Sequence, residues 1–299
     1  MPNETAVESK TGRKYFLDFP REPGAGLTFL LNLHGGGSVG MWQRRYFPAH
    51  VHVDDYRLVV ATPSAATKEP FRHWDREADD EHLRAVVGQV CDRFGPDNIR
   101  ACWLVGHSQG GMTANRLLHD PFFADRVDGW LSLSGGRIGS APLVEGFGPP
   151  RTPEQQEAMA RMRGRFPAPT MPEADFSFIY ATGEYEISEL PETSPWAEKY
   201  GAGPRVRRPD VVDTEGGKVH DTRWGDRSTP SWGREPGPGT AEIYVYPGGR
   251  DGRLIADVVR RGKGHTEGLE PHITEELITM MIGAPGGKLA ALHADRTVP

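Results

Sequence analysis

In residues 101–118, a glycine-rich pentapeptide lies between an expected strand and an expected helix. The apolar run 101–105 (Ala-Cys-Trp-Leu-Val) is typical of a buried strand, and residues 111–118 carry a helical pattern. Between them stands Gly106-His107-Ser108-Gln109-Gly110, which has the form G-x-S-x-G. On a sharp turn from strand to helix, the serine hydroxyl is exposed at the end of a sheet, above the positive end of the helix. The segment therefore predicts a strand–turn–helix unit in which Ser108 is a candidate nucleophile.

Composition places the chain among ordinary globular proteins with a sizeable core. Its 299 residues are 37% hydrophobic and 25% charged, with a net charge of −6. An acidic balance excludes nucleic acid and anionic membrane surfaces as expected partners. The first residues lack a basic segment followed by an apolar one, and no apolar run approaches membrane-spanning length, so we expect a cytoplasmic protein.

The cysteines and histidines indicate neither a disulfide nor a metal centre. Cys91 falls in an expected helix and Cys102 in the strand before the turn, where buried thiols are common. No grouping of histidine, cysteine and carboxylate residues has the spacing of a zinc site. We therefore expect no metal and no other cofactor.

Short apolar runs alternate with helical patterns along the chain, which favours an α/β fold with a mostly parallel central sheet and helices on both faces. Helices are expected over Asp79–Phe94 and from about Pro271 to Ile282. The expected strands are Leu27–Leu33, Tyr56–Thr62, Ala101–Val105, Val127–Ser134 and Phe176–Thr182. We interpret residues 1–299 as a single domain.

Two long stretches interrupt this alternation, and long insertions in compact domains usually carry function or cover a site. We interpret residues 137–175 as a candidate lid and residues 187–240 as a candidate substrate-shaping insertion, with a hairpin around Val211–Val219. A second hairpin is expected from Ala241–Tyr246 and Arg253–Arg260. Whether the second insertion makes a homodimer is left open.

A serine nucleophile needs a histidine base and a carboxylate that orients the base, in the chain order serine, acid, histidine. Glu186 is the first choice for the acid because Gly183-x-x-Glu186 follows an apolar strand, and Glu184 is the alternative. His265 is the expected base because Gly262-Lys-Gly-His-Thr266 is a loop flanked by glycine before the last helix. The remaining histidines considered are expected at the surface, namely His50, His52, His220 and His272.

A glycine-rich loop, His34-Gly35-Gly36-Gly37, follows the first long strand and can bring backbone N–H groups to a developing negative charge. We expect Gly36 or Gly37 to donate one hydrogen bond and the Gln109 N–H another, which makes an oxyanion hole. Trp42, Tyr46, Phe71 and Trp74 follow strands whose carboxyl ends form the site, so they are candidates to line a substrate pocket, and packing in the core or at its rim is an equally open alternative for each. His107 is a further candidate for the pocket. Arg137 could meet an anionic substrate, although a surface position is the more common outcome.

With these motifs the chain resembles the α/β-hydrolase superfamily, and in particular its polyhydroxybutyrate depolymerase and feruloyl esterase group. The finer resemblance is carried by the G-x-S-x-G turn, Asp79-Asp80-x-x-Leu83, the segment 94–99 and Gly262-x-Gly264-His265-Thr266. Members of that group often have aspartate where Glu186 stands and tryptophan where Glu267 stands, and are commonly secreted. The resemblance implies a serine esterase with Ser108, Glu186 and His265 as its triad. The departures from the group argue against polymer or cell-wall substrates, so we expect a small soluble ester.

The sequence leaves rival functions open. A peptidase or amidase would use the same triad, and a lyase or acyltransferase could retain it without net ester cleavage. A binding module on this fold usually lacks a triad member, whereas all three positions are filled here. The expected partner is therefore a small-molecule ester substrate.

Overall fold

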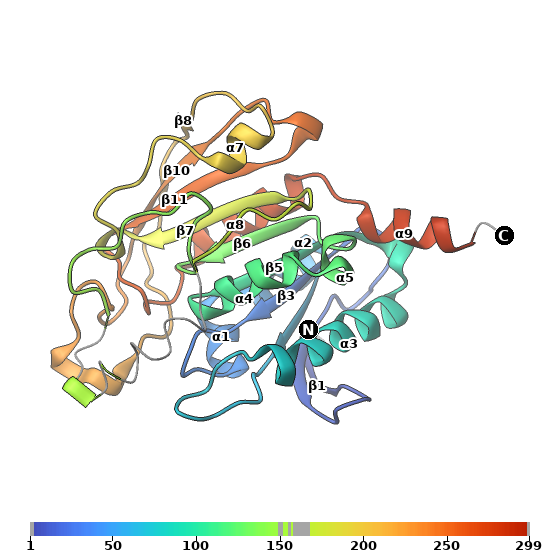
Figure 1. Ribbon diagram of the computed structural model, residues 1–299, viewed down its shortest axis with the longest axis horizontal. Coiled ribbons are helices and arrows are strands. Elements are labelled where there is room, and N and C mark those ends of the chain that lie inside the picture. Colours follow the sequence, from blue (N-terminus) through green and yellow to red (C-terminus); the bar gives the residue numbers. More distant parts are fainter. Residues whose placement is uncertain (1–2, 149–151, 155–156, 158–167, 298–299) are drawn as a thin grey trace.

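The computed structural model describes residues 3–148, 152–154, 157 and 168–297. Within these residues the strands join into one mixed sheet in the order β1-β2-β4-β3-β5-β6-β7-β11-β10-β8, and β9 pairs with β10 (Figure 1). Six neighbouring strands in its centre run parallel. They are β4 (Leu58–Pro63), β3 (Leu27–Leu33), β5 (Ile99–His107), β6 (Gly129–Leu133), β7 (Ser177–Gly183) and β11 (Ile255–Arg261).

Antiparallel strands extend the sheet at both edges. At one edge, β2 (Lys14–Asp18) pairs with β4, and β1 (Asn3–Val7) pairs with β2. At the other edge, β10 (Thr240–Val245) pairs with β11 and carries the short strands β8 (Val206–Arg207) and β9 (Val211–Val212). The parallel strands are therefore in the interior of the sheet, where both faces are covered.

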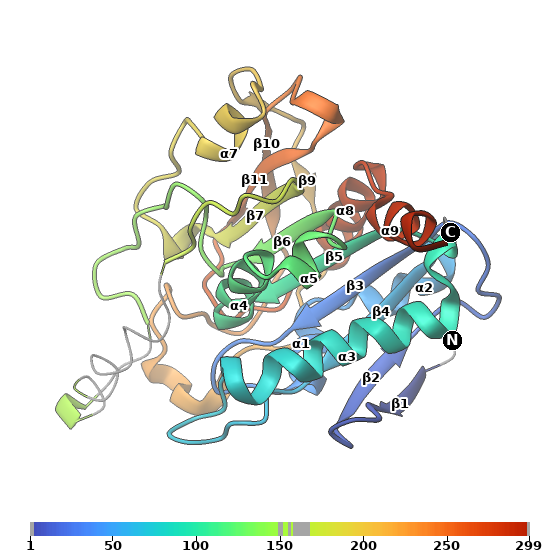
Figure 2. The same ribbon diagram turned by 45° about the vertical axis from the view of Figure 1, so that its right-hand side comes forward.

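Helices cover both faces of the sheet, as Figure 2 shows from the side. One face packs against α3 (Arg76–Phe94), α4 (Gln109–Leu118), α5 (Pro121–Ala124), α7 (Pro195–Lys199) and α9 (Lys288–Thr297). The opposite face packs against α1 (Gly40–Tyr46), α2 (Val53–Tyr56) and α8 (Pro271–Gly283).

Alternate residues of each parallel strand enter the two resulting cores. In β5, Cys102 and Leu104 belong to the core under α3 and α4, whereas Trp103 and Val105 belong to the core under α1 and α8. Successive side chains of a strand point to opposite faces, so a strand buried on both faces must be apolar throughout. This explains why the parallel strands are continuous apolar runs in the sequence.

The predicted strands and helices are present, with ends that differ by a few residues. The expected strand Tyr56–Thr62 begins only at Leu58, because Tyr56 ends α2 and Arg57 caps that helix in the left-handed region at φ 53°. The hairpin predicted from Ala241–Tyr246 and Arg253–Arg260 is confirmed as the β10–β11 pair. The cysteines lie as expected in α3 and β5.

At the edges of the sheet, one predicted hairpin is wrong and one observed hairpin was not predicted. The hairpin expected around Val211–Val219 is wrong, because β9 pairs with β10 and not with a neighbouring segment. The β1–β2 hairpin was not predicted; β1 is half-exposed along its whole length and lacks the apolar run of a central strand. Edge strands contact less of the core, so their hydrophobic signal in the sequence is weak.

The candidate lid is described only in part. Residues 149–151, 155–156 and 158–167 of the predicted segment 137–175 lie outside the described residues. Of the rest, Leu143 forms an isolated bridge with Ile187, and the N–H of Val144 donates to the Glu186 carbonyl over 3.0 Å. The roles of this segment and of the insertion 187–240 stay predictions.

Candidate active site

Ser108 lies at the junction of β5 and α4 in a strained backbone conformation. Its φ and ψ angles are 52° and −120°, which a residue with a side chain rarely adopts. Such strain typically costs about 1–3 kcal/mol and persists only where the surroundings impose it. A Cβ atom on Gly106 would lie 2.3 Å from the Gly110 backbone, so only glycine permits this close crossing of strand and helix. The turn therefore holds the Ser108 side chain outward from the sheet.

The three residues predicted as a triad lie in a continuous hydrogen-bonded chain. Ser108 Oγ is 2.8 Å from His265 Nε2, and His265 Nδ1 is 2.7 Å from Glu186 Oε2. Each residue follows a different parallel strand, β5, β7 or β11, at its carboxyl end. His265 and Glu186 are 3% and 2% exposed, so bulk water competes little with these bonds. This arrangement can activate a serine hydroxyl.

Glu186 is held as a buried carboxylate. Its Oε1 atom accepts hydrogen bonds from the Gly183 N–H over 2.7 Å and from the Ser134 hydroxyl over 2.6 Å. Burial alone would raise the pKa of Glu186, but the attraction of His265 and the hydrogen bonds from His265, Ser134 and Gly183 outweigh it and lower that pKa. The group is therefore ionised at neutral pH and can orient His265.

The alternative acid, Glu184, lies away from this chain. Its carboxylate accepts the Gly262 N–H over 2.7 Å and forms an ion pair with Arg261 over 2.8 Å. These contacts hold the turn after β11. The structure thus brings Glu186, and not Glu184, to the histidine.

The backbone of His265 is itself held by two buried side chains. Its carbonyl oxygen accepts a hydrogen bond from His107 Nε2 over 2.9 Å and from the Tyr46 hydroxyl over 3.2 Å. Burial, and then the neighbouring His265 ring, lower the pKa of His107 well below its ordinary value, so His107 is neutral. Only its Nε2–H tautomer can donate to a carbonyl.

Tyr46 and His107 were expected to line a substrate pocket, and Tyr46 is not among the residues that line the cavity next to Ser108. It is 1% exposed and stacks against Trp42 with a centroid distance of 4.9 Å. His107 does line that cavity but is 3% exposed. Both side chains therefore support the His265 loop more than they offer contact surface.

Glu267 holds the other side of the same loop. Its Oε1 accepts the Gly264 N–H over 3.0 Å, and Lys263 beside it pairs with Glu270 over 3.0 Å. Glu270 also pairs with the buried Arg260 over 3.0 Å. Members of the polyhydroxybutyrate depolymerase and feruloyl esterase group often have tryptophan at position 267. In this chain Glu267 instead accepts a hydrogen bond from the backbone of the His265 loop.

The structure distinguishes the two alternatives, Gly36 and Gly37, that the sequence left open for the donor from the glycine-rich loop. The Gly37 N–H donates to the Arg72 carbonyl over 2.7 Å, so the expectation that Gly37 could serve the oxyanion hole is wrong for this structure. In the part of the chain that the structure describes, the N–H groups of Gly36 and Gln109 have no hydrogen-bond partner. A Cβ on Gly36 would lie 3.7 Å from Gln109 Oε1, so the two segments adjoin. Gly36 and Gln109 are therefore the candidate donors.

Trp74 packs against the glycine-rich loop. Its indole Nε1–H donates to the His34 carbonyl over 2.7 Å, and its backbone N–H donates to Gln109 Oε1 over 3.1 Å. The ring is 3% exposed and packs 4.7 Å from the His34 ring. Trp74 was expected to line a substrate pocket; it does not line the cavity next to Ser108, although it lines a second, larger cavity, and its contacts join the loop to α4.

A cavity of about 290 Å³ opens onto Ser108 and His265. Its wall combines the glycine-rich loop, α1, the serine turn, the His265 loop and part of the insertion 187–240. The lining residues are Gly35, Gly36, Gly37, Ser38, Val39, Trp42, His107, Ser108, His220, Asp221, Thr222, Arg223, Trp232, His265 and Thr266. Of the aromatic residues expected here, Trp42 lines the cavity, while Phe71 lies behind Gly36, where a Cβ would be 3.1 Å from the Phe71 ring.

Both predicted insertions supply contacts that sequence reasoning missed. Trp232, from the insertion 187–240, stacks on the His265 ring at 4.9 Å, and Phe147, from the candidate lid 137–175, meets the same ring edge-on at 5.2 Å. His220, expected at the surface, lines the cavity. The richness of the insertion 187–240 in Trp, Arg and Gly was the available signal, but it does not say which residues face the site.

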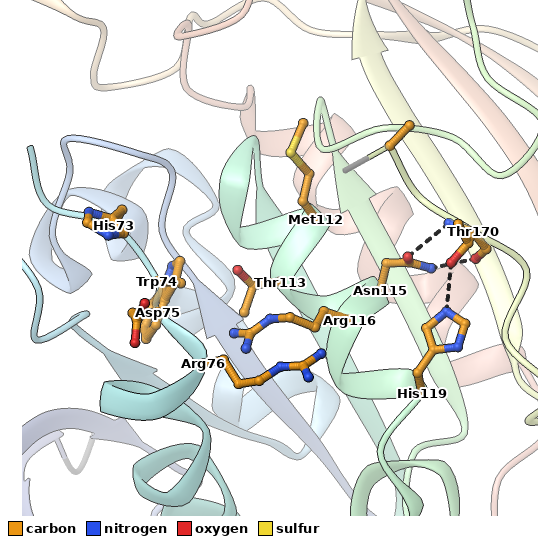
Figure 3. A pocket seen from close by; sticks show the side chains of 11 residues that line it. His73, Trp74, Asp75, Arg76, Met112, Thr113, Asn115, Arg116, His119 and Thr170 are labelled. Carbon is orange, nitrogen blue, oxygen red and sulfur yellow. Dashed lines mark hydrogen bonds between the residues drawn. The ribbon is translucent and has the colours of Figure 1, made fainter. Parts of the chain in front are cut away.

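A larger cavity of about 510 Å³ lies beside the first, between the start of α3 and helix α4 (Figure 3). Figure 3 shows Arg76 and Arg116 pointing into the same space, and Asn115 and His119 bonded to Thr170. Arg116 is paired with Asp80 over 2.8 Å. Neither Ser108 nor His265 lines this cavity, so the smaller one is the candidate active site.

Arg137 and the remaining histidines lie outside the site. Arg137 is 2% exposed and forms a bidentate pair with Asp257, with Nε–Oδ1 and Nη2–Oδ2 distances of 2.8 and 2.9 Å. It is therefore neither a substrate ligand nor a surface residue. His50 and His52 lie in a short 3-10 helix, and His272 begins α8.

Across the described residues, no group of three or more His, Cys, Asp or Glu side chains is placed to hold a metal ion. None of the described helices is both long and apolar enough to cross a membrane.

Comparisons with known proteins identify the fold. Residues 28–200 match the family described as the α/β-hydrolase fold. An acetyl xylan esterase from Aspergillus awamori is similar with a TM-score of 0.51 at 13% identity, over 93% of this chain and 98% of that chain. A Thermus thermophilus protein has a TM-score of 0.46 at 16% identity, over 94% of this chain and 97% of that chain. A thermostable carboxylesterase from a metagenomic library has a TM-score of 0.41 at 18% identity, over 62% of this chain and 69% of that chain. No curated protein matches the sequence.

Proposed function

The chain belongs to the α/β-hydrolase fold family, and from this premise we propose that it is a serine hydrolase that cleaves carboxylic esters through an acyl-enzyme. One observation carries the proposal: Ser108, His265 and Glu186 form an unbroken hydrogen-bonded chain whose serine lies in a strained turn beside a cavity. On this fold the same order of groups serves acyl transfer.

In the proposed first step, His265 Nε2 takes the proton of Ser108 Oγ as that oxygen bonds to the ester carbonyl carbon. The carbonyl oxygen becomes an oxyanion, which the N–H groups of Gly36 and Gln109 stabilise. The imidazolium of His265, stabilised by the Glu186 carboxylate, then gives its proton to the leaving alcohol as the ester C–O bond breaks.

In the second step, water attacks the acyl-enzyme. His265 takes a proton from the water, and the new oxyanion again faces Gly36 and Gln109. Collapse breaks the bond to Ser108 Oγ, which recovers its proton from His265, and the carboxylic acid leaves. The stacked Trp232 ring and the buried Glu186 keep His265 in one orientation through both steps.

A small soluble ester is the substrate class we propose. The cavity of about 290 Å³ is at the small end of ligand pockets, which suits one short acyl or alcohol group. The resemblance to the polyhydroxybutyrate depolymerase and feruloyl esterase group supports ester chemistry, and the acetyl xylan esterase with a similar fold is compatible with it.

The test is hydrolysis of p-nitrophenyl esters from acetate to octanoate, together with methyl ferulate, by the wild-type chain and Ser108→Ala. We expect turnover that Ser108→Ala lowers by about 10⁴-fold or more, as for other serine triads. Ser188→Ala, in an exposed loop, is the matched control and should keep full activity. Turnover that survives Ser108→Ala, or no turnover of any ester, would contradict the proposal.

A further inference from the structure

One basic side chain of the insertion faces the catalytic cavity in a fixed position. Arg223 lines the same cavity as Ser108 and His265. Its guanidinium is gripped by Asp221, with distances of 2.8 Å from Nε to Oδ1 and 2.6 Å from Nη2 to Oδ2. Because both bonds must break before the group can turn, the direction of the third nitrogen, Nη1, is set.

Asp221 is in turn held by the cavity wall. It is 8% exposed and also accepts hydrogen bonds from the Trp232 indole over 3.1 Å and from the Arg223 backbone N–H over 3.0 Å. Its oxygens are thus fully used within the protein. Among the described residues that line the cavity, Asp221 is the only carboxylate, and none of these residues presents an unsatisfied negative charge from this wall.

The third nitrogen of Arg223 reaches the turn that carries the candidate oxyanion donor. A Cβ atom on Gly37 would lie 3.0 Å from Arg223 Nη1, so the guanidinium approaches the Gly36–Gly37 backbone closely. No hydrogen bond from Nη1 is found in the described part of the chain. The side chain is 58% exposed, which leaves this nitrogen open to a ligand in the cavity.

We propose that Arg223 is a specificity-determining residue that binds a carboxylate group carried by the ester substrate. This inference rests on the proposed esterase function. A fixed N–H₂ group of a guanidinium donates charge-assisted hydrogen bonds to a carboxylate, and pre-orientation by Asp221 removes the entropy cost of ordering a flexible arginine. Because Arg223 is the one fixed cation among the described lining residues, a monoanionic group fits better than a phosphate dianion.

The experiment compares esters that differ only in this charge. On the acyl side, mono-p-nitrophenyl glutarate is paired with p-nitrophenyl pentanoate, and on the alcohol side 4-acetoxybenzoate is paired with 4-methylphenyl acetate. For at least one pair, Arg223→Gln should lower the ratio of kcat/KM between the charged and neutral ester by about 10-fold or more. Arg223→Lys should keep a larger part of this ratio than Arg223→Gln, because lysine keeps the positive charge but cannot form the two parallel hydrogen bonds with Asp221.

Arg227→Gln is the matched control. Arg227 is exposed in the same short helical segment, Thr222–Arg227, and does not line the cavity. It should leave both the ratio and the absolute rates unchanged. An unchanged ratio in Arg223→Gln for both pairs, or an equal change in Arg227→Gln, would overturn the inference.

Binding without catalysis separates this inference from the proposed function. In Ser108→Ala, calorimetry with glutarate and benzoate should show binding that Arg223→Gln weakens by about 10-fold. If no ester is hydrolysed but this binding difference is present, the esterase proposal fails and the carboxylate site stands. If esters are hydrolysed through Ser108 and neither carboxylate binds, the carboxylate site fails alone.

Discussion

At the scale of single residues, the candidate site depends on one buried carboxylate. Glu186 is charged although burial opposes it, because three donors converge on it: His265 Nδ1, the Ser134 hydroxyl and the Gly183 N–H. Glu184, two residues earlier, is directed to Arg261 and Gly262. Substituting each of the two carboxylates in turn therefore tests which one orients His265.

We expect Glu186→Gln to lower kcat by about 10²–10⁴-fold, because an amide cannot stabilise the imidazolium of His265 or fix its tautomer. Glu184→Gln should change kcat by less than about 3-fold. Steady-state kinetics on the best p-nitrophenyl ester, with thermal unfolding of each variant to verify folding, measures both. Equal small losses would remove Glu186 from the mechanism.

Residues next to one another in a motif were predictable, and contacts between distant loops were not. Ser108 and His265 follow from short glycine-flanked motifs, and Glu186 from its spacing after a strand. The sequence could not separate Gly36 from Gly37, because the carbonyl that occupies the Gly37 N–H belongs to Arg72 in another loop. Arg223 was missed for the same reason, since its partner and its place in the cavity depend on how the insertion folds back.

At the scale of elements, a buried carboxylate, Glu8, lies at the contact between the β1–β2 edge hairpin and α3. Glu8, in the turn, is 0% exposed and accepts hydrogen bonds from the Lys10 N–H, the Thr11 N–H and the Thr11 hydroxyl over 2.5, 2.9 and 2.5 Å. His82 of α3 lies 3.3 Å from it. Burial would raise the pKa of Glu8, but the hydrogen bonds from Thr11, Lys10 and His82 lower it from 4.5 to about 2.

This lowered pKa predicts how stability depends on pH. A carboxylate whose pKa is lower in the folded state stabilises it fully above the unfolded value, near 4.5, and loses that contribution as the pH falls towards 2. Glu8→Gln should therefore lower the free energy of unfolding by roughly 1–3 kcal/mol at pH 7, and by much less near pH 2. Urea unfolding at pH 7, 4 and 2.5 measures the difference from wild type.

The control for this prediction is Glu4→Gln in the same hairpin. Glu4 pairs with Arg93 at the surface, with its side chain 40% exposed, and such pairs contribute about 0–1 kcal/mol. A wild-type minus Glu8→Gln difference that stays constant from pH 7 to 2.5 would show that Glu8 does not stabilise the fold as an anion.

At the scale of the whole molecule, the sheet was predictable and its insertions were not. The parallel strands are buried on both faces, so their apolar runs are visible in the sequence, and the crossover helix α3 keeps its helical spacing of Leu83, Val86, Val87 and Val90. The insertion 187–240 consists of irregular chain that carries only short elements: helix α7, the 3-10 segment Thr222–Arg227 and the two-residue strands β8 and β9. Its conformation depends on tertiary hydrogen bonds, which leave no periodic pattern in the sequence.

Those tertiary bonds tie the insertion to the loop that carries His265. The N–H groups of His265, Thr266 and Gly268 donate to the carbonyls of residues Ser231, Trp232 and Val219, over 3.0, 2.9 and 2.7 Å. Backbone carbonyls of the insertion thus satisfy the N–H groups of the loop after β11. The insertion and the histidine loop should accordingly open together and not as a lid that moves over a finished site.

Hydrogen exchange measured by mass spectrometry tests this coupling. Peptides covering residues 265–268 and residues 230–233 of the insertion should exchange at similarly slow rates, because the N–H groups of His265, Thr266, Gly268, Trp232 and Gly233 are hydrogen-bonded. Peptides covering the exposed turn 248–252, between β10 and β11, should exchange fast and serve as the internal reference. If residues 230–233 instead exchange as fast as that turn while residues 265–268 stay protected, the insertion opens without the histidine loop. The insertion would then act as a moving cover over a loop in which His265 stays paired with Ser108 and Glu186.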